Sequence, residues 1–343
     1  MYKADSLIAA LQGAKNKVAA QAFDHYKAYS SGSGKITAVK YNSDGSAFAS
    51  GNEFGMIIVR DVISSYITHV LNSNSTDRLG NKLDKKSPPV NTLSFDVSNK
   101  YLAVTYTNGK VEVWDLANKK KTFEIEPTND IDLGKTSSSI FAFFTVDNNF
   151  LIYGNGNGKV QLLPIAGKAL PQILTNEYEN TFCLDYSLNA NSLIMGNEQT
   201  VKIIDVETKK KLFQFIACDS GVVTNVKFNA QYWQVACLCS DGTLSVFDVK
   251  TGEQLFSTNV SPQTSQVAFS PNGKYLAADD GEKKIIVWDM DSKKQTSTLI
   301  GHQTAIKCLD FDTNSQHIVS GSSDCMVKMW LKTQVKEEEK SGN

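Results

Sequence analysis

The chain lacks any apolar run long enough to cross a membrane. No uninterrupted apolar stretch in the 343 residues approaches the roughly 18 that a membrane span needs. A signal-peptide pattern is also missing, because the apolar run 7–11 (LIAAL) is too short and Asp5 stands where a basic leader belongs. We therefore expect an intracellular protein, either cytoplasmic or nuclear.

Arginine is almost absent. Of the 35 basic residues only Arg60 and Arg78 are arginine, and the net charge is −1. Because arginine is the side chain suited to bidentate contacts with guanine and phosphate, this composition argues against sequence-specific DNA recognition. The small net charge also predicts no general attraction to nucleic acid or acidic membranes.

Cysteine is sparse and lacks the spacing of a metal site. No two cysteines follow a C-x-x-C pattern, and no pair of histidines lies nearby. We expect reduced, buried cysteines that act as small apolar residues, with zinc binding or a disulfide framework as the alternatives. The six are Cys183, Cys218, Cys237, Cys239, Cys308 and Cys325.

No catalytic constellation can be recognised. The four histidines are scattered, and none sits beside a serine or cysteine in a nucleophile motif. The glycine-rich segment 154–159 (GNGNGK) has the wrong spacing for a Walker loop, and Val160 opens a strand where that motif needs a helix. We therefore predict a non-enzymatic protein without metal or cofactor, and interpret 154–159 as a hairpin turn.

What the chain does contain is a segment that recurs about every 40 residues. Residues 99–115 read NKYLAVTYTNGKVEVWD, residues 273–289 read GKYLAADDGEKKIIVWD, and residues 317–330 read HIVSGSSDCMVKMW. Such a period is the signature of a stacked or radial repeat array. Aligning the units on the Trp-Asp position gives seven, at Arg60-Asp61, Trp114-Asp115, Leu163-Pro164, Ile204-Asp205, Phe247-Asp248, Trp288-Asp289 and Trp330-Leu331.

Each unit has the pattern of short antiparallel strands. Residues 265–269 (SQVAF) alternate polar and apolar side chains, and residues 275–278 and 285–289 form two further runs separated by turn residues. A fourth strand is expected after each Trp-Asp position. Asn-Gly and Asp-Gly pairs recur in register at the turns, which predicts hairpins of type I′. These pairs are Asp44-Gly45, Asn108-Gly109, Asn157-Gly158, Asp241-Gly242, Asn272-Gly273 and Asp280-Gly281.

The chain resembles the WD40-repeat β-propeller family over roughly residues 22–330. The last unit carries the resemblance most specifically, with Gly301-His302, the segment 320–324 (SGSSD) and Trp330. The other units depart from the family pattern, because none has a Gly-His pair and the third lacks both Trp and Asp. The resemblance implies an all-β, seven-bladed propeller with a buried hydrogen-bonded network in its last unit, formed by His302, Ser320, Asp324 and Trp330.

The propeller is expected to fill residues 22–336 as one domain. Residues 22–29 are expected to supply the outer strand of the last unit, so that both ends of the chain close the ring and no sheet edge is left open there. Residues 333–336 are the alternative for that strand. Residues 1–21 form an N-terminal extension that is predicted to be helical from its 3.6-residue apolar spacing, with the entry to a blade's inner strand as the alternative for residues 13–18. Residues 337–343 are expected to be a disordered tail.

Two segments are longer than the repeat period allows. Residues 72–89 and 127–139 each connect an outer strand to the next inner strand, on either side of the second unit. Long insertions in compact domains are usually functional or disordered, and both interpretations stay open for these two. The candidate partner-binding residues in them are Arg78, Lys82, Lys85, Lys86, Asp130 and Asp132.

Lysine clusters follow the Trp-Asp position in three units. In a propeller these positions lie between the third and fourth strands, all on one face, where they would hold an acidic partner, phospholipid or an RNA backbone. The other interpretation is solvated hairpin tips whose charge discourages edge-to-edge association. The lysines are Lys119, Lys120, Lys121, Lys209, Lys210, Lys211, Lys293 and Lys294.

The resemblance implies a scaffold. A closed propeller is a rigid disk with loops on two faces, so what it binds depends on its loops, and WD40-like proteins commonly serve as subunits of larger assemblies. We predict a non-catalytic scaffold for protein–protein interactions within a multiprotein complex. The alternatives are a reader of anionic lipid or RNA through the lysine turns, a G-protein β-like signalling subunit and a propeller enzyme.

Overall fold

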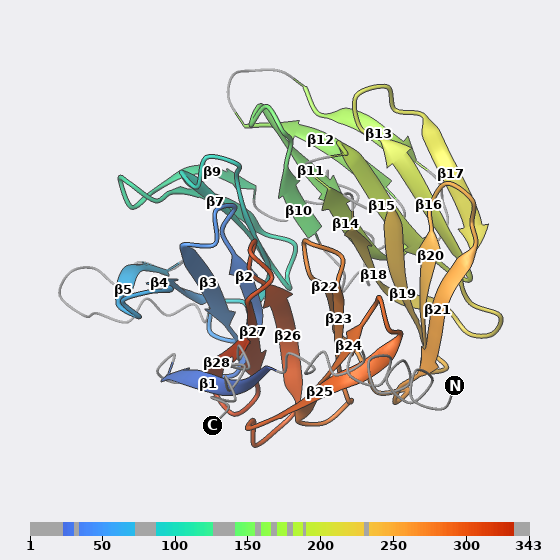
Figure 1. Ribbon diagram of the computed structural model, residues 1–343. Helices are drawn as coiled ribbons and strands as arrows, with labels where there is room; N and C mark the ends of the chain where they lie inside the picture. The colour runs from blue at the N-terminus through green and yellow to red at the C-terminus, as the bar shows by residue number, and fades with distance from the viewer. Residues whose placement is uncertain are drawn as a thin grey trace, which may run out of the picture.

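The computed structural model describes residues 23–30, 34–72, 87–125, 141–154, 159–165, 170–176, 181–187, 190–229 and 233–332. Every helix or strand within these ranges is a β-strand, and the strands form seven sheets of four. Each sheet is one blade, numbered in the order of its inner strand, and the blades stand side by side around a ring (Figure 1). The predicted seven-bladed, all-β propeller is confirmed.

Four blades are built from the first part of the chain, with their strands in sequence order from the channel to the rim. Blade 1 consists of β2 (Ile36–Tyr41), β3 (Ala47–Asn52), β4 (Met56–Asp61) and β5 (Ile67–Asn72). Blade 2 consists of β6 (Val90–Phe95), β7 (Tyr101–Tyr106), β8 (Val111–Asp115) and β9 (Lys120–Ile125). Blade 3 consists of β10 (Phe141–Phe144), β11 (Phe150–Gly154), β12 (Lys159–Pro164) and β13 (Gln172–Asn176). Blade 4 consists of β14 (Thr181–Ser187), β15 (Ser192–Asn197), β16 (Thr200–Asp205) and β17 (Lys211–Ile216).

The remaining three blades complete the ring. Blade 5 consists of β18 (Val223–Asn229), β19 (Gln234–Cys239), β20 (Thr243–Asp248) and β21 (Gln254–Asn259). Blade 6 consists of β22 (Val267–Phe269), β23 (Tyr275–Asp279), β24 (Lys284–Asp289) and β25 (Lys294–Ile300). Blade 7 consists of β26 (Ile306–Phe311), β27 (His317–Ser322), β28 (Met326–Lys332) and, as its outer strand, β1 (Phe23–Ser30).

The outer strand of blade 7 comes from the other end of the chain. Strand β1 pairs antiparallel with β28, with Tyr26 opposite Trp330. Figure 1 shows the blue β1 lying against the red β28. Closure by the N-terminal segment, expected from the sequence, is confirmed. The alternative strand at 333–336, the extension 1–21 and the tail 337–343 lie outside the described residues.

The seven Trp-Asp positions aligned in the sequence share one place in the fold. Each lies at the end of a third strand, and its first residue pairs with the second residue of the strand before it. Arg60 lies opposite Phe48, and Trp330 lies opposite Ile318. The sequence alignment of the units is therefore also a structural alignment, and residues in different blades can be compared position by position.

The turns lie where the Asn-Gly and Asp-Gly pairs predict them, but they are not of type I′. Only the glycine of each described pair has positive φ, as at Gly45 (74°) and Gly109 (94°), whereas type I′ needs positive φ at both central residues. Gly109 N–H donates to the carbonyl of Tyr106, and Tyr106 N–H to the carbonyl of Lys110. These bonds enclose a three-residue loop, which places its glycine last in the left-handed region.

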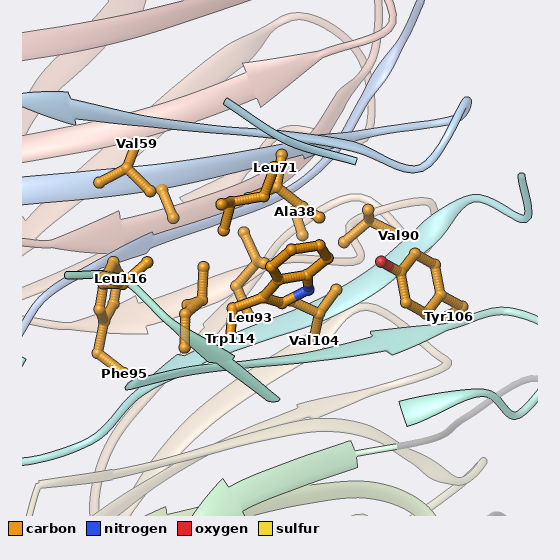
Figure 2. Close-up of a cluster of buried hydrophobic side chains, with 13 residues drawn as sticks. Ala38, Val59, Leu71, Val90, Leu93, Phe95, Val104, Tyr106, Trp114 and Leu116 are labelled. Atoms are coloured by element: carbon orange, nitrogen blue, oxygen red, sulfur yellow. The ribbon is translucent and has the colours of Figure 1, made fainter. Parts of the chain in front are cut away.

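The apolar core is divided into seven clusters, one between each pair of neighbouring blades. Figure 2 shows the cluster between blades 1 and 2, where Leu71 and Ala38 face Leu93, Val104 and the indole of Trp114. A single four-stranded sheet cannot bury both of its faces, so each blade depends on both neighbours. We therefore expect a break in the ring to expose two apolar blade faces.

Glycine near the end of the second strand lets the blades approach closely. A Cβ at Gly51 would lie 2.5 Å from the side chain of Val90, the first residue of the next inner strand. Gly321 meets Ile36 of blade 1 in the same way, at 2.3 Å. Larger residues would push neighbouring blades apart at these points.

Candidate functional site

The four network residues of blade 7 lie in one chain of hydrogen bonds. His302 Nδ1 is 2.9 Å from Asp324 Oδ2, and His302 Nε2 is 2.8 Å from Ser320 Oγ. Trp330 donates its indole N–H to Ser320 Oγ at 2.8 Å. The chain ties the loop before β26 to the second strand, to the turn that follows it and to the third strand.

Burial fixes where the protons of this network lie. Desolvation lowers the pKa of His302, against the opposing effect of Asp324. Desolvation would raise the pKa of Asp324, but hydrogen bonds from Gln303 N–H and His302 outweigh it, so this pKa is lowered. An ionised carboxylate only accepts, so we assign the proton to His302 Nδ1 and let Ser320 donate to Nε2. Trp330 then donates to Ser320, Ser320 donates to His302, and His302 donates to Asp324.

Blade 5 carries a disulfide where blade 7 carries this network. Cys218 and Cys239 are joined, with their Cα atoms 5.9 Å apart. Cys218 comes two residues after β17, as His302 comes two residues after β25, and Cys239 ends β19 as Ser322 ends β27. The expectation of six reduced cysteines is wrong for these two. Their spacing gave no signal, because only the fold brings the loop before blade 5 to the end of its second strand.

The other four cysteines are free thiols. Cys183, Cys237 and Cys308 are buried, and Cys325 is partly exposed. Burial raises the pKa of Cys183 to about 12 and also raises the pKa values of Cys237 and Cys308. These three are therefore unreactive thiols that pack as small apolar side chains.

Blade 2 has a buried carboxylate in its network. Glu112 is fully buried and accepts hydrogen bonds from Trp114 Nε1 at 3.0 Å and Tyr106 Oη at 2.8 Å. The ammonium groups of Lys110 and Lys121 lie 3.1 and 3.2 Å from its Oε1. Lys121, one of the lysines expected to face an anionic ligand, is thus paired inside its own blade.

The other lysines of the predicted anionic face lie at or beside the turns between third and fourth strands. Lys119, Lys209 and Lys293 occupy left-handed backbone positions, with φ of 52°, 58° and 57°. In the last of these turns Asp289 Oδ1 accepts the N–H and the hydroxyl of Ser292 at 2.8 and 2.9 Å. The remaining lysines of this set, Lys120, Lys210, Lys211 and Lys294, are exposed.

The predicted partner-binding residues of the two insertions lie outside the described residues. This applies to Arg78, Lys82, Lys85, Lys86, Asp130 and Asp132. A role for them in binding stays a prediction.

One end of the central channel opens into a cavity of about 820 Å³. Each inner strand has an aromatic residue at the same place in its blade, and the residue just before that aromatic lines the cavity wall. The seven blades therefore place one side chain each at the same level. These residues are Lys40, Ser94, Phe143, Asp185, Lys227, Ala268 and Asp310. This ring was not predicted from the sequence, although six of the seven residues lie 21 positions before the second residue of their Trp-Asp pair and Asp185 lies 20 before.

Two ion pairs join neighbouring blades at this level. Lys40 Nζ lies 2.9 Å from Asp310 Oδ1, and Lys227 Nζ lies 3.4 Å from Asp185 Oδ1. The second oxygen of each carboxylate accepts a backbone N–H, from Tyr41 and Phe228 respectively, at 2.9 Å. One pair joins blade 7 to blade 1 and the other joins blade 4 to blade 5.

Blade 1 has a group of exposed apolar side chains at its rim, the blade 1 apolar cluster. Ile63 and Tyr66, in the turn before β5, are 87% and 76% exposed, and Ile67 and Val70 of β5 are 48% and 56% exposed. In the corresponding turns of blades 2, 4, 5 and 6, the position of Ile63 is held by small or charged residues, namely Ala117, Glu207, Lys250 and Asp291.

Within the described ranges, no three or more His, Cys, Asp or Glu side chains are grouped so that they could hold a metal ion. In the same part of the chain, no helix is long and apolar enough to cross a bilayer.

Three stretches of the chain match the family model described as "WD domain, G-beta repeat", at residues 79–115, 256–289 and 293–330. The chain is similar to a guanine nucleotide-binding protein subunit beta from Oryza sativa subsp. japonica, at 22% identity over 318 residues that cover 87% of this chain and 80% of that protein. It is also similar to histone acetyltransferase type B subunit 2 from Candida glabrata, at 24% identity over 197 residues that cover 54% of this chain and 47% of that protein.

A solved structure extends the likeness to the whole ring. The chain is similar in fold to the Cps50 (Swd1) β-propeller domain of Myceliophteria thermophila, with a TM-score of 0.72 and 16% identity, covering 89% of this chain and 98% of that one. The matched repeats end in the third strands of blades 2, 6 and 7. The matched repeats and the ring of seven four-stranded blades together support the WD40-repeat β-propeller family for this chain.

Proposed function

We propose that this protein is a non-catalytic scaffold that holds partner proteins as a subunit of a multiprotein complex. The observation that carries the proposal is the blade 1 apolar cluster, four large apolar side chains exposed within eight residues. Contiguous exposed apolar surface commonly marks a protein interaction site, and aromatic side chains such as Tyr66 are enriched at the centres of such sites.

The relatives support the same proposal. Two of the proteins to which the chain is similar are named as subunits, one of a guanine nucleotide-binding protein and one of a histone acetyltransferase. Packing between neighbouring blades makes the ring rigid, so its surface turns are held in fixed positions. Such a surface suits the binding of several proteins at once. We place the scaffold in the cytoplasm or nucleus as part of this proposal.

The test is affinity purification of the tagged full-length protein at native expression, followed by mass spectrometry. Ile63→Ser with Tyr66→Ser removes the most exposed half of the blade 1 apolar cluster. The matched control, Leu212→Ser with Ile216→Ser, removes two side chains of blade 4 that are 41% and 67% exposed. We expect a stable partner set from the wild type and the control, and its loss from the cluster variant.

Other outcomes would contradict the proposal or change its site. A wild-type protein that purifies without any stable partner is not a scaffold. Equal partner loss in both variants would mean that the blade 1 apolar cluster is not a specific contact. A third variant, with residues 72–89 replaced by a short Gly-Ser linker, tests the predicted contribution of the first insertion.

A G-protein β-like signalling subunit is the second candidate. The extent of similarity to the Oryza protein, 87% of this chain, favours it over an unrelated complex. Recovery of other guanine nucleotide-binding protein subunits in the same purification would support this candidate. A stable partner set without them would exclude it.

A lipid or RNA reader is less well supported. Lys121 is paired with Glu112, and Lys209 donates to Gln172 at 2.9 Å, so part of the lysine face is already engaged within the protein. Binding of either anion would show a steep dependence on salt concentration.

A further inference from the structure

We propose that the cavity at the end of the central channel binds the acidic side chains of a partner protein segment. This inference rests on the proposed function, because it names the chemistry of a segment that the scaffold would hold. Two ammonium groups in the cavity wall carry the argument, and two residues of the same wall have buried polar atoms without partners.

The lysines of the two ion pairs reach farther into solvent than their carboxylates. The Lys40 side chain is 46% exposed and its partner Asp310 17%, and Lys227 is 34% exposed against 17% for Asp185. Each carboxylate already accepts two hydrogen bonds, one from its lysine and one from a backbone N–H. An ammonium has three N–H groups and uses one on its carboxylate. A ligand that enters the cavity therefore meets hydrogen-bond donors first.

Two further polar atoms belong to residues of the cavity wall and have no partner. Tyr41 Oη and Asn229 Nδ2 are buried without a hydrogen bond. Each of the two residues is 4% exposed. A buried polar group without a partner is costly and rare in native proteins. Tyr41 follows Lys40 directly, and Asn229 comes two residues after Lys227. Blades 1 and 5 therefore each combine an ammonium group with a wall residue whose buried polar atom has no partner.

The two ion pairs, one between blades 7 and 1 and one between blades 4 and 5, lie across the channel from each other. Blades 2 and 3 separate them on one side of the ring and blade 6 on the other, and the side chains there at the same level, Ser94, Phe143 and Ala268, are uncharged. Although desolvation lowers the pKa of Lys40, Asp310 and, from across the channel, Asp185 raise it, so the lysine stays charged. The volume of about 820 Å³ lies within the range of ligand sites. A segment with two or more carboxylates would reach both sides.

One carboxylate at the rim opposes such a ligand and provides a sharp test. Asp44 lies in the turn after β2, lines the cavity, and accepts the N–H of Ser46 at 2.8 Å. Hydrogen bonds from Ser46 lower its pKa, so it is ionised at neutral pH. Removing its charge should strengthen the binding of an acidic segment, which misfolding would not do.

The experiment is a titration of the purified full-length protein into fluorescein-labelled hexaglutamate, read by fluorescence anisotropy, with labelled hexaglutamine as the control peptide. Lys227→Gln removes one ammonium group, and Ser94→Glu adds a carboxylate while it keeps both ion pairs. We expect each to weaken binding about tenfold, as for the loss of one charge-assisted hydrogen bond. Asp44→Asn should tighten binding several-fold.

The matched control is Lys119→Gln, which removes the same charge from a turn outside the cavity and should leave affinity unchanged. Equal weakening by Lys119→Gln and Lys227→Gln would assign binding to the lysine turns and overturn the cavity site. Failure of hexaglutamate to bind, or equal binding of hexaglutamine, would overturn it as well. A protein that keeps a stable partner set but does not bind hexaglutamate retains the proposed function and loses this site.

Discussion

In blades 7 and 5 the loop that enters the blade is attached to the second strand of that blade by different chemistry. In blade 7 the loop that enters the blade is held through His302, by hydrogen bonds to Ser320 and Asp324. In blade 5 the loop is held through the covalent bond between Cys218 and Cys239. The comparison teaches that the fold requires an attachment at this point and leaves its chemistry open.

The residue at the position of Trp330 in the third strand also differs between the blades. Blade 5 has Phe247 at the position of Trp330, and Cys237 at the position of Ser320. Phenylalanine has no N–H, so no hydroxyl is needed to accept one. Blade 2 keeps its Trp but satisfies the indole N–H with Glu112, which lies on the same strand. A buried indole N–H needs an acceptor, and the three blades meet or avoid that need in three ways.

The largest expected effect is at the centre of the blade 7 network. Trp330→Ala removes a fully buried aromatic side chain and leaves Ser320 without its indole donor. We expect the free energy of unfolding to fall by about 3–5 kcal/mol, measured by denaturant titration. Trp330→Phe, which copies blade 5, should cost less. A negligible loss in Trp330→Phe would mean that the indole N–H contributes nothing, and an equal loss in both variants would mean that a phenyl ring cannot replace any part of the indole.

Loss of the blade 5 disulfide should rank second. Cys218→Ala with Cys239→Ala opens a link between residues 21 apart, for which we expect about 3 kcal/mol of lost stability. Reductant should lower the melting temperature of the wild type and leave that of the double variant unchanged. Alkylation of all six cysteines in the unfolded, unreduced wild type would show that the link is absent.

Removal of the histidine should come next. His302→Ala loses the hydrogen bonds to Ser320 and Asp324, and we expect about 2 kcal/mol, because the buried partners lose their counterpart. Thermal unfolding beside the Cys218 and Cys239 variant compares the two attachments directly. A larger loss from His302→Ala than from the disulfide variant would reverse the order proposed here.

The carboxylate of blade 2 should matter less. Glu112→Gln keeps the size of the side chain but removes the charge that Lys110 and Lys121 contact. We expect about 1–2 kcal/mol. Glu124 still contacts both lysines, at 2.5 and 2.7 Å, so neither ammonium is left without a carboxylate. A loss above that of Trp330→Ala would make blade 2 the more critical network.

The smallest expected effect is the pH dependence of blade 7. The pKa of His302 is lowered in the fold, while an unfolded histidine has a pKa of about 6.5. Below that pH the unfolded chain binds a proton that the folded chain does not, so the free energy of unfolding should fall as pH decreases below about 6.5. His302→Ala should flatten the profile in this window. A wild type that gains stability as pH drops through this window would contradict the assignment of a neutral His302.

Most of the fold could be predicted from the sequence because the repeat marks the boundaries of each blade. Positions such as Asp61 and Asp205 predicted where third strands end, because every blade solves the same packing problem with the same register. The disulfide was not predicted, since Cys218 and Cys239 approach only when the loop before β18 lies against the end of β19. The channel pairs were missed for the same reason: Lys40 and Asp310 come from inner strands at opposite ends of the chain, and their contact depends on the closed ring.

The disulfide also bears on the predicted compartment. Disulfides persist in oxidising compartments and are rare in the cytosol. The redox state of Cys218 and Cys239 in cells therefore reports where this scaffold resides, independently of its partners.

Closure by β1 sets a condition on how the protein is made. The first residue of this strand pairs with Lys332, so it leaves the ribosome long before its partner exists. At translation rates of about 5–20 residues per second, β1 waits on the order of 15–60 s. During that time the strand has an open edge that a chaperone or another nascent chain can occupy, and blade 7 is completed only after β28 has been synthesised.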